Sequence, residues 1–481
     1  MSGVALGIDV GTTSVKAVLL DSAGLIVDVA DNEHGILRRP GVVEADPHQW
    51  WESVCAAVQR LSARIDDVAA VGVTGNMSSV VLLDEYHTAL GNAPLLADSR
   101  GERQLSALAP DVRELIVART RNHPAAAFSL STLLYLRDEA PAVLEKTRTW
   151  VSAKDYVRLC LTGVVGTDLT DAYNSLLIRT DGGDWDRELL AAVGLPERIF
   201  PVIYPSDQAA GTVTEQAAAR TGIPAGVPVV TGAGDVAAGT LGAGITAPGD
   251  VLILLGTSVT VVAPVDDGPG RAWPGNLTYH PPACGRFWLA LASLLTGGLA
   301  LNWLRDLLGS TTIPQDLGEP LAAADPLVFL PHLAGTGSPR FDPYAQGSVV
   351  GLRPSTRGAD LVQAMFEAIG FEIAEALTLA GTGADGEILI SGGGTRLPAW
   401  VQTITDILGR PVLVCANPEV SAIGAARLAG FSQQPPATAV RYEPRAAAVR
   451  YEPRAERARP LRQRADNYYR TRDFLAPYYQ P

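Results

Sequence analysis

Cysteine and histidine are scarce in this chain of 481 residues, and their spacing excludes two classes of protein. The four cysteines lie far apart in the sequence: Cys55, Cys160, Cys284 and Cys415. They form no CxxC pair, so neither a zinc site nor a disulfide framework is indicated, and we expect free buried thiols in a reducing compartment. The six histidines also show no metal-ligand spacing, and we expect them to be structural or to lie on the surface.

Positive charge and long apolar runs are scarce as well. The sequence has 38 Lys and Arg against 51 Asp and Glu, which gives a net charge of −13. Such a chain repels nucleic acids and anionic membranes, so we expect neither as a partner and look for a small molecule instead. The longest apolar runs, such as 251–255, are too short to cross a bilayer. The first residues lack the basic and apolar regions of a signal peptide, so we predict a cytoplasmic protein.

Composition and periodicity indicate an α/β protein. Hydrophobic residues make up 47% of the chain, enough for large cores, and the length favours two or three domains. Residues 4–10, 15–20 and 25–30 read as strands, and the short turn between the second and third makes that pair antiparallel. A helical pattern at 48–63 and an apolar strand at 68–74 follow. Strands then alternate with helical patterns, which is typical of an α/β fold.

A hairpin of the same kind occurs again in the second half of the sequence. Apolar strands flank Gly256–Ser258 just as they flank Gly11–Ser14. Aligning the two turns places Leu254 opposite Asp9, so only the first copy carries a carboxylate. The pattern predicts an internal duplication with one such hairpin in each half.

The first turn combines a carboxylate with a hydroxyl-rich backbone. A tight turn between strands points several backbone N–H groups into one hollow, and the hydroxyls of Gly11–Ser14 add donors for phosphate oxygens. A carboxylate beside phosphate is repulsive unless a divalent cation lies between them, so we interpret Asp9 as a ligand of Mg²⁺ on a nucleotide. The alternative is an Asx-turn that caps the hairpin. No GxxxxGK[ST] sequence is present, so the turn is not a Walker A loop.

Two further segments could contribute to a site. An apolar strand at 388–391 runs into Gly392–Gly394 and then a helix, where the backbone could approach a flat ring or an α-phosphate. The alternative is an ordinary glycine loop. Asp235 stands between a strand and a helix of small residues, where a carboxylate could take the proton from an attacking hydroxyl group. The alternative is a helix N-cap.

The two hairpin turns, the Asp235 segment and the glycine run resemble, in their order along the chain, the FGGY carbohydrate kinases. This family is a sugar-kinase branch of the actin–Hsp70–hexokinase fold. The most specific feature is Gly347–Leu352 followed, after seven residues, by Asp360–Glu367, which fits the family's C-terminal signature at every constrained position. The resemblance covers about residues 4–430. Within the family the chain is most like the xylulokinases. Two stretches match the sequence pattern of these enzymes, Lys154–Tyr156 and Ser391–Gly394.

The resemblance implies ATP and Mg²⁺ as cofactors and assigns roles residue by residue. Asp235 is the implied general base, and Asp9 belongs to the magnesium shell. The implied phosphate contacts are Thr12, Thr13, Gly256 and Thr257. Gly393 and Gly394 would line the adenine or α-phosphate pocket. The implied sugar-facing residues are Asn76, Met77, Ser78, Asp98 and Arg100.

Several sugar-reading positions depart from the xylulokinase pattern. Ser78 stands where these enzymes have a histidine, and Val236 stands where the residue after the base is usually Asn or Gln. The Trp and Asn of the W-N-D-x-R pattern are replaced by Leu96 and Ala97. A site that loses polar partners discriminates differently among substrate hydroxyl groups, so the departures leave the identity of the sugar open.

We predict two ribonuclease-H-like (actin/Hsp70/hexokinase-type) α/β domains with an interdomain cleft, at residues 1–238 and 239–430. The first should hold most of the sugar and the second the adenine. Residues 431–481 should form a C-terminal extension, partly disordered or a surface arm, because apolar periodicity is lost there. In this segment AVRYEPRA occurs twice, at 439–446 and 448–455.

Three functions remain open. The first is an ATP-dependent kinase that phosphorylates a primary hydroxyl of a small sugar, D-xylulose or a related pentulose. The second is a kinase of another polyol or sugar acid, such as ribulose, gluconate, erythritol or glycerol. The third is a nucleotide-dependent binding or chaperone-like module of the same fold, against which Asp235 and the C-terminal signature count. The expected partner is a small sugar or polyol, and a homodimer stays open.

Overall fold

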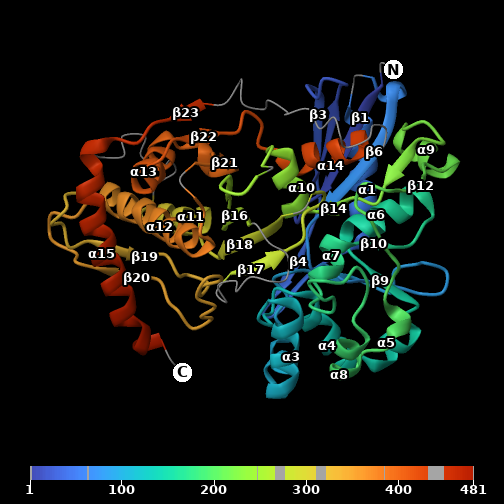
Figure 1. The fold of residues 1–481 in the computed structure, drawn as a ribbon, viewed down its shortest axis with the longest axis horizontal. Helices are drawn as coiled ribbons and strands as arrows, with labels where there is room; N and C mark the ends of the chain where they lie inside the picture. The colour runs from blue at the N-terminus through green and yellow to red at the C-terminus, as the bar shows by residue number, and fades with distance from the viewer. Residues whose placement is uncertain are drawn as a thin grey trace.

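Two seven-stranded sheets, one in each half of the chain, form the frame of the molecule (Figure 1). The computed structural model describes residues 3–61, 64–245, 247–265, 277–285, 287–309, 321–383, 385–431 and 449–479. Among these residues, no helix combines the length and the apolar content needed to cross a bilayer.

The first sheet has the strand order β12-β13-β6-β1-β2-β3, and β14 also pairs with β6. Its strands are β1 (Val4–Val10), β2 (Ser14–Leu20), β3 (Ile26–Glu33), β6 (Val68–Gly75), β12 (Ala209–Thr212), β13 (Pro228–Val230) and β14 (Ala233–Gly234). The strands predicted at 4–10, 15–20, 25–30 and 68–74 are therefore confirmed. The turn before β3 is fixed by Asp21, whose Oδ1 accepts the backbone N–H groups of Ala23 and Leu25.

The second sheet has the order β17-β18-β16-β15-β21-β22-β23. Its strands are β15 (Val251–Leu255), β16 (Val259–Val265), β17 (Thr278–His280), β18 (Trp288–Leu294), β21 (Ile388–Ser391), β22 (Val412–Val414) and β23 (Val449–Tyr451). β1 is parallel to β6 and antiparallel to β2, and β15 is likewise parallel to β21 and antiparallel to β16. The predicted duplication is confirmed at the level of topology.

Smaller elements complete the two halves. Short strands lie outside the large sheets: β4 (Leu37–Arg39), β5 (Val42–Ala45), β7 (Val81–Leu83), β8 (Ala93–Pro94), β9 (Thr149–Val151), β10 (Thr167–Asp168), β11 (Ile203–Tyr204), β19 (Val328–Leu330) and β20 (Ser348–Val350). Helices of the first half are α1 (Pro47–Arg60), α2 (Glu102–Ser106), α3 (Pro110–Thr120), α4 (Ser129–Glu139), α5 (Pro141–Lys146), α6 (Ala153–Thr162), α7 (Leu169–Tyr173), α8 (Arg187–Ala192) and α9 (Glu215–Thr221). The helical pattern at 48–63 is confirmed as α1, which Pro47 begins and whose N-cap is Asp46.

Two helices of small residues lie between the sheets, α10 (Asp235–Gly242) and α14 (Val420–Phe431) (Figure 1). α14 comes from the second half of the chain but packs on β1 and β6 of the first sheet and on α10. The contact is backbone to backbone, because a Cβ added to Gly424 would lie 1.8 Å from the carbonyl oxygen of Ala238. A Cβ on Gly7 of β1 would similarly lie 1.9 Å from the carbonyl oxygen of Ala422. Small residues thus let the two halves meet.

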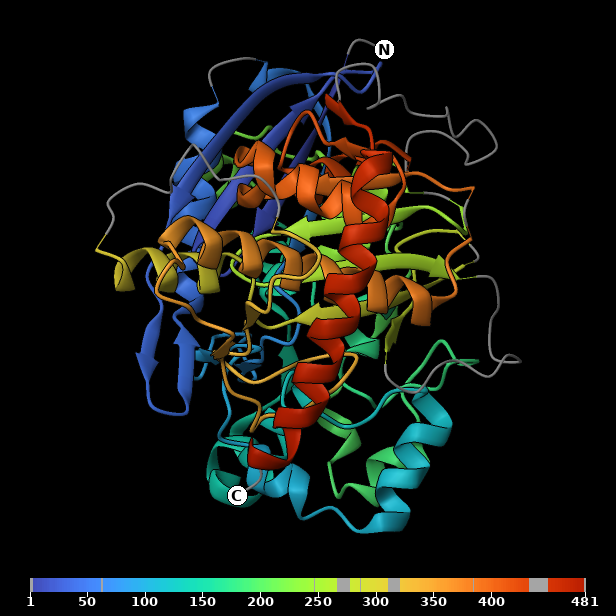
Figure 2. The ribbon, with the colours of Figure 1, turned by 90° about the vertical axis from the view of Figure 1, so that its left-hand side faces the viewer.

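Three more helices belong to the second half: α11 (Gly298–Leu307), α12 (Gly358–Ala380) and α13 (Pro398–Leu408). The C-terminal segment packs on this half, where it contacts α12 and α13. β23 adds an antiparallel edge strand beside β22. α15 (Ala458–Leu475) runs along one side of the molecule (Figure 2), where Arg464 forms a buried ion pair with Glu367 and Tyr468 donates to Glu372 at 2.7 Å. Of the two alternatives for this extension, the described residues 449–479 correspond to the surface arm, and buried partners hold its arginine-rich sequence. The first AVRYEPRA copy, 439–446, lies outside the described residues.

We expect Gly424→Ala to weaken the fold because its methyl group would overlap the carbonyl group of Ala238. Overpacking of this kind costs about 1–3 kcal/mol of unfolding free energy, which urea unfolding would measure. Gly430→Ala in the same helix is the matched control, since nothing lies within 4 Å of its added Cβ. Replacing that glycine should stabilise by up to about 1 kcal/mol. Equal effects of the two variants would contradict the packing described for α14.

Candidate active site

Three parallel strand ends in the first sheet bring the predicted catalytic residues together. The pairing register aligns Asp9 of β1 with Thr74 of β6, and Thr74 with Ala233 of β14. Two residues further on, Asn76 and Asp235 follow the ends of neighbouring strands. Ligands of α/β proteins bind at the carboxyl ends of parallel strands, so this edge of the sheet is the candidate site.

Asp235 is the first residue of α10, and the N-cap position belongs to Gly234. The N-cap alternative for Asp235 is therefore wrong. Its Oδ1 accepts the N–H of Val236 at 2.8 Å, and the carboxyl group is partly buried. Burial first, then the neighbouring carboxylates of Asp9 and Asp171, raise the pKa of Asp235 to about 8. A carboxyl group with so raised a pKa, at the open end of a sheet, is suited to accept a proton near neutral pH.

Asp9 meets the requirements of a magnesium-shell residue. Its Oδ1 is buried and has no hydrogen-bond partner among the described residues. Burial raises the pKa of Asp9 to about 6, Lys16 opposes that rise, and Glu419, which pairs with Lys16 at 2.5 Å, adds to it. No group of three or more His, Cys, Asp or Glu side chains in the described parts of the chain is arranged to hold a metal ion. Mg²⁺ usually takes one or two carboxylates and completes its shell with water and phosphate, so a single aspartate fits.

Other buried oxygens at the same strand ends also lack partners in the described structure: Thr74 Oγ1, Asn76 Oδ1 and Asp171 Oδ1. Buried polar atoms are normally hydrogen-bonded, and exceptions gather where a ligand or water supplies the partner. Most of these atoms are acceptors, so the site is suited to a ligand that carries several hydroxyl donors.

The first turn is closed by a backbone hydrogen bond and leaves its threonines exposed. The N–H of Gly11 donates to the carbonyl oxygen of Ser14 at 3.0 Å, and Thr12 and Thr13 both face solvent. His34 braces the turn from β3: its backbone N–H donates to Thr13, and its Nε2 lies 3.1 Å from the carbonyl oxygen of Gly11. The histidine is structural, as predicted, but its contact with this turn has no signal in the sequence spacing.

The second turn is one residue shorter than the first and is backed by a helix. The N–H of Gly256 donates to Ser258 at 3.0 Å, and Thr257 is exposed. The N–H of Gly298, at the start of α11, donates to the carbonyl oxygen of Gly256 at 2.8 Å. The glycine pair at 297–298, directly before a helical pattern, could have predicted this contact, but it was not recognised from the sequence.

The glycine run lies beside the second turn. Gly392 has a φ of 104°, and Gly393–Arg396 form one 3₁₀ turn. A Cβ on Gly394 would lie 2.4 Å from Cγ of Leu255, the residue before the second turn, whereas nothing lies within 4 Å of a Cβ on Gly393. Gly394 is thus needed for packing against β15, and Gly393 leaves open space.

A short segment before and at the start of α14 connects these parts. Ser391 donates to the carbonyl oxygen of Pro418 at 3.3 Å, Glu419 pairs with Lys16, and Ser421 donates to the carbonyl oxygen of Asp235 at 3.1 Å. Residues 418–421 therefore contact the strand that leads into the glycine run, the first hairpin and the candidate base.

Of the residues implied to face the sugar, three lie at the strand ends. Asn76 donates to the carbonyl oxygen of Val10 at 3.0 Å, and Met77 packs against Gly234. Ser78 has a φ of 65°; its hydroxyl donates to Ala127 at 2.5 Å and accepts from Asn174. Its hydroxyl is therefore engaged within the protein.

Asp98 and Arg100 form a separate cluster. Asp98 accepts the N–H of Val43 at 3.0 Å and pairs with Arg100 at 2.8 Å. Arg100 also pairs with Glu44 at 2.6 Å and lies 5.0 Å from the ring centroid of Tyr135. Within the described residues, no hydrogen bond or ion pair joins this cluster to Asp9 or Asp235.

Lys154 is a buried cation near the site. In the sequence it stands out only as part of a stretch that resembles the xylulokinases. Lys154 Nζ lies 2.7 Å from Asp155, 3.0 Å from Asp168 and 3.2 Å from Asp171. Burial alone would lower the pKa of Lys154, but the three carboxylates hold it above its ordinary value. The cluster reaches the base through Thr170, whose hydroxyl donates to Asp168 at 2.7 Å and accepts the N–H of Gly234 at 2.8 Å.

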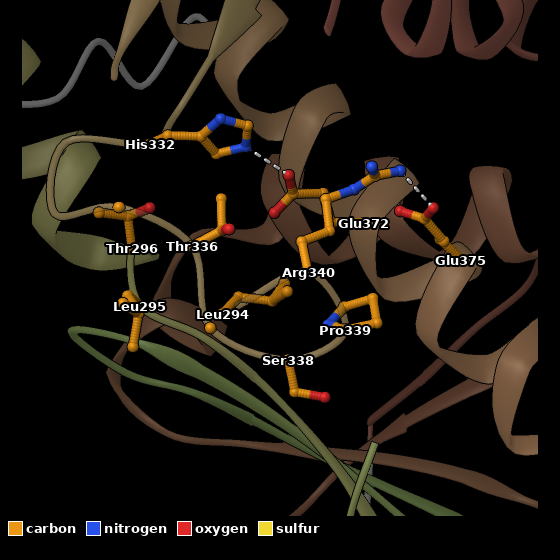
Figure 3. A pocket seen from close by; sticks show the side chains of 12 residues that line it. Leu294, Leu295, Thr296, His332, Thr336, Ser338, Pro339, Arg340, Glu372 and Glu375 are labelled. Atoms are coloured by element: carbon orange, nitrogen blue, oxygen red, sulfur yellow. Dashed lines mark hydrogen bonds and ion pairs between the residues drawn. The ribbon is translucent and has the colours of Figure 1, made fainter. Parts of the chain in front are cut away.

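A small pocket lies in the second half (Figure 3), and its lining residue Leu294 pairs with Val259, directly after the second turn. His332 points toward Glu372 at 2.7 Å, and Arg340 pairs with Glu375 at 2.7 Å. None of the predicted site residues lines this pocket.

Comparison with known proteins identifies the family of both halves. Residues 4–242 match the N-terminal domain and residues 251–432 the C-terminal domain of the FGGY family of carbohydrate kinases. The chain is 30% identical to a xylulose kinase of Escherichia coli over 441 residues, which is 89% of this chain and 90% of that protein. It is 32% identical to a xylulose kinase of Streptomyces rubiginosus over 447 residues, 91% of this chain and 90% of that one.

Two solved structures extend the comparison. A xylulose kinase from Brucella ovis superposes with a TM-score of 0.90 at 30% identity and covers 99% of this chain and 100% of its own. A gluconate kinase from Lactobacillus acidophilus reaches the same TM-score at 24% identity, covers 100% of this chain and 99% of its own, and shares the fold. With both domains matched over most of their length, the chain belongs to the FGGY family of carbohydrate kinases, ATP-dependent sugar phosphotransferases of the two-domain actin-like fold.

Proposed function

We propose that this kinase phosphorylates a primary hydroxyl group of D-xylulose or a related pentulose. The observation that carries the proposal is the position of Asp235 at the strand ends, among buried oxygens that lack hydrogen-bond donors. Relatives named xylulose kinase, at 30% identity over most of the chain, support the choice of sugar.

In this mechanism Asp235 accepts the proton of the acceptor hydroxyl as its oxygen attacks the γ-phosphorus of ATP. The bond from that phosphorus to the β–γ bridging oxygen breaks, and ADP leaves. Mg²⁺, when bound, neutralises phosphate charge, and Asp9 would hold it. The backbone N–H groups and hydroxyls of Thr12, Thr13 and Thr257 would orient the phosphates. Positioning and charge neutralisation contribute most to such a loose transition state.

The charge of the site favours a neutral acceptor. Asp9 and Asp171 lie close enough to Asp235 to raise its pKa. A sugar acid would add a further negative charge to this group, at a cost that grows with burial. This argues for a ketose or polyol over gluconate. A neutral polyol other than a pentulose is the second candidate, because Ser78 is engaged within the protein and Val236 offers no hydrogen bond.

The deciding experiment measures ADP release by the purified full chain against ketoses, polyols and aldonic acids. We expect the largest kcat/KM with a pentulose and no turnover of aldonic acids. ATPase activity that no sugar changes, together with peptide binding, would support the chaperone-like alternative instead.

Asp235→Asn should abolish transfer, because the variant cannot accept the proton of the acceptor hydroxyl. The expected loss in kcat is about 10²–10⁴-fold, typical of a removed general base. ATP binding, measured by calorimetry, should persist. Turnover near that of the unmodified enzyme would refute the role of Asp235.

The same variant should change how stability depends on pH. The pKa of Asp235 is about 8 in the folded protein but near about 4 in an unfolded chain. Between these values the unfolded state binds fewer protons, so this group makes the fold progressively less stable as pH rises. The unfolding free energy of Asp235→Asn, relative to the unmodified protein, should therefore increase from about pH 4 to pH 8 and then level off. Urea unfolding across this range tests it, and a pH-independent difference would be inconsistent with the raised pKa.

Asp9→Asn should weaken the response to magnesium. The Mg²⁺ concentration for half-maximal activity should rise by about 10–100-fold, as for lost metal-shell partners elsewhere. Asp31→Asn, an exposed carboxylate on neighbouring β3, is the control and should leave the magnesium titration unchanged. Identical titrations of the two variants would show that Asp9 does not serve the metal.

A further inference from the structure

One carboxylate oxygen of the buried ionic cluster around Lys154 has no hydrogen-bond partner among the described residues. Lys154 and its partners Asp155, Asp168 and Asp171 are at most 4% exposed. The cation is shared among three carboxylates, so each needs further donors to compensate its burial.

Asp168 and Asp171 differ in how they obtain these donors. Oδ2 of Asp168 accepts from the Thr170 hydroxyl and the Ser206 hydroxyl, both at 2.7 Å, and its Oδ1 lies 3.0 Å from Lys154 Nζ. Oδ2 of Asp171 accepts from Ser152 at 2.7 Å and lies 3.2 Å from Lys154 Nζ. Oδ1 of Asp171 is buried, and no partner for it exists among the described residues.

This free oxygen is on the side of the cluster that faces the candidate site. It lies 3.3 Å from the position that a Cβ on Gly234 would take, directly before the base Asp235. Cγ and Sδ of Met77 lie 2.9 and 3.3 Å from the same point. Met77 is therefore the side chain beside Oδ1, and an unbranched, flexible methionine can move to admit a ligand.

We propose that Asp171 is a specificity-determining residue whose Oδ1 accepts a hydrogen bond from a hydroxyl of the acceptor next to the one that Asp235 deprotonates. The proposal rests on the proposed kinase function and narrows it to neutral acceptors with adjacent hydroxyl groups. A carboxylate oxygen without a donor is costly when buried, and a sugar hydroxyl is a donor of the right kind.

This hydrogen bond to Asp171 explains how the enzyme recognises a sugar although some of the family's usual polar side chains are absent. Ser78 bonds within the protein to Ala127 and Asn174, and Val236 has no polar side chain. Asp171 comes from α7, a different element, and supplies an acceptor to the same strand ends.

The test is Asp171→Asn in the full-length enzyme. The amide oxygen can keep the bonds to Ser152 and Lys154, while the amide N–H₂ replaces an acceptor by a donor at the Oδ1 position. We expect kcat/KM for the acceptor to fall by about 10–100-fold, mainly through KM, with KM for ATP unchanged. Asp168→Asn is the matched control: it perturbs the same lysine and leaves Oδ1 of Asp171 in place, so it should lower the melting temperature without this selective loss.

Monodeoxy analogues of the accepted sugar identify the hydroxyl involved. With the unmodified enzyme, one analogue should show a similar fold-loss in kcat/KM. With Asp171→Asn, the same analogue should show no further loss. An unchanged acceptor KM, or losses that multiply for every analogue, would overturn the proposal. If Asp171→Asn melts below the assay temperature, Asp171→Ser completes the same cycle. Failure of the unmodified enzyme to phosphorylate any sugar would instead refute the proposed function.

Discussion

The close contact between α10 and α14 is the constraint on which the rest of the structure depends. α10 begins at the candidate base, and α14 belongs to the second half of the chain but packs on the first sheet. Gly424 against Ala238 and Gly7 against Ala422 leave no room for side chains. Because the two helices touch backbone to backbone, residues 418–421 reach Lys16 and Asp235. The strand that leads into the glycine run of the second half is thereby tied to the candidate site of the first.

The site carries more acid than its cations neutralise. Lys154 is shared by three aspartates, and Lys16 is paired with Glu419. The pKa values of Asp9 and Asp235 are raised, and so is that of Asp171 within the Lys154 cluster. A phosphotransfer site benefits from this imbalance, because a metal cation is attracted where the triphosphate must bind and a proton acceptor is kept basic.

Local pattern predicted the strands of the first sheet and singled out Asp9 and Asp235, each with a structural alternative left open. The resemblance to the FGGY carbohydrate kinases implied the two-domain fold and the roles of both acids. Strand alternation and a hydroxyl-rich turn identified the hairpin after Asp9, and its second copy placed Gly256 and Thr257. Asp235 followed from a strand, a glycine and a helix of small residues. These signals are local, so they survive in a single sequence.

The remaining features depend on contacts between distant segments. Lys154 and Asp171 meet only when α6 and α7 pack, and nothing in their spacing announces it. β23 was hidden because its strand lies within an arginine-rich repeat without apolar alternation, and its partner β22 supplies the pairing. Asp98 and Arg100, implied by the resemblance to face the sugar, pair with each other, and Arg100 also pairs with Glu44, a partner distant in the sequence.

The position of β23 and α15 has a consequence for biosynthesis. A chain emerging from the ribosome can complete its first sheet early, because β1 to β14 all precede residue 235. The second sheet lacks its outermost strand, and the buried carboxylates of α12 lack Arg464 and Tyr468, until residues 449–475 have been synthesised. The second half therefore completes its sheet and the partners of its buried carboxylates later in synthesis than the first half completes its sheet.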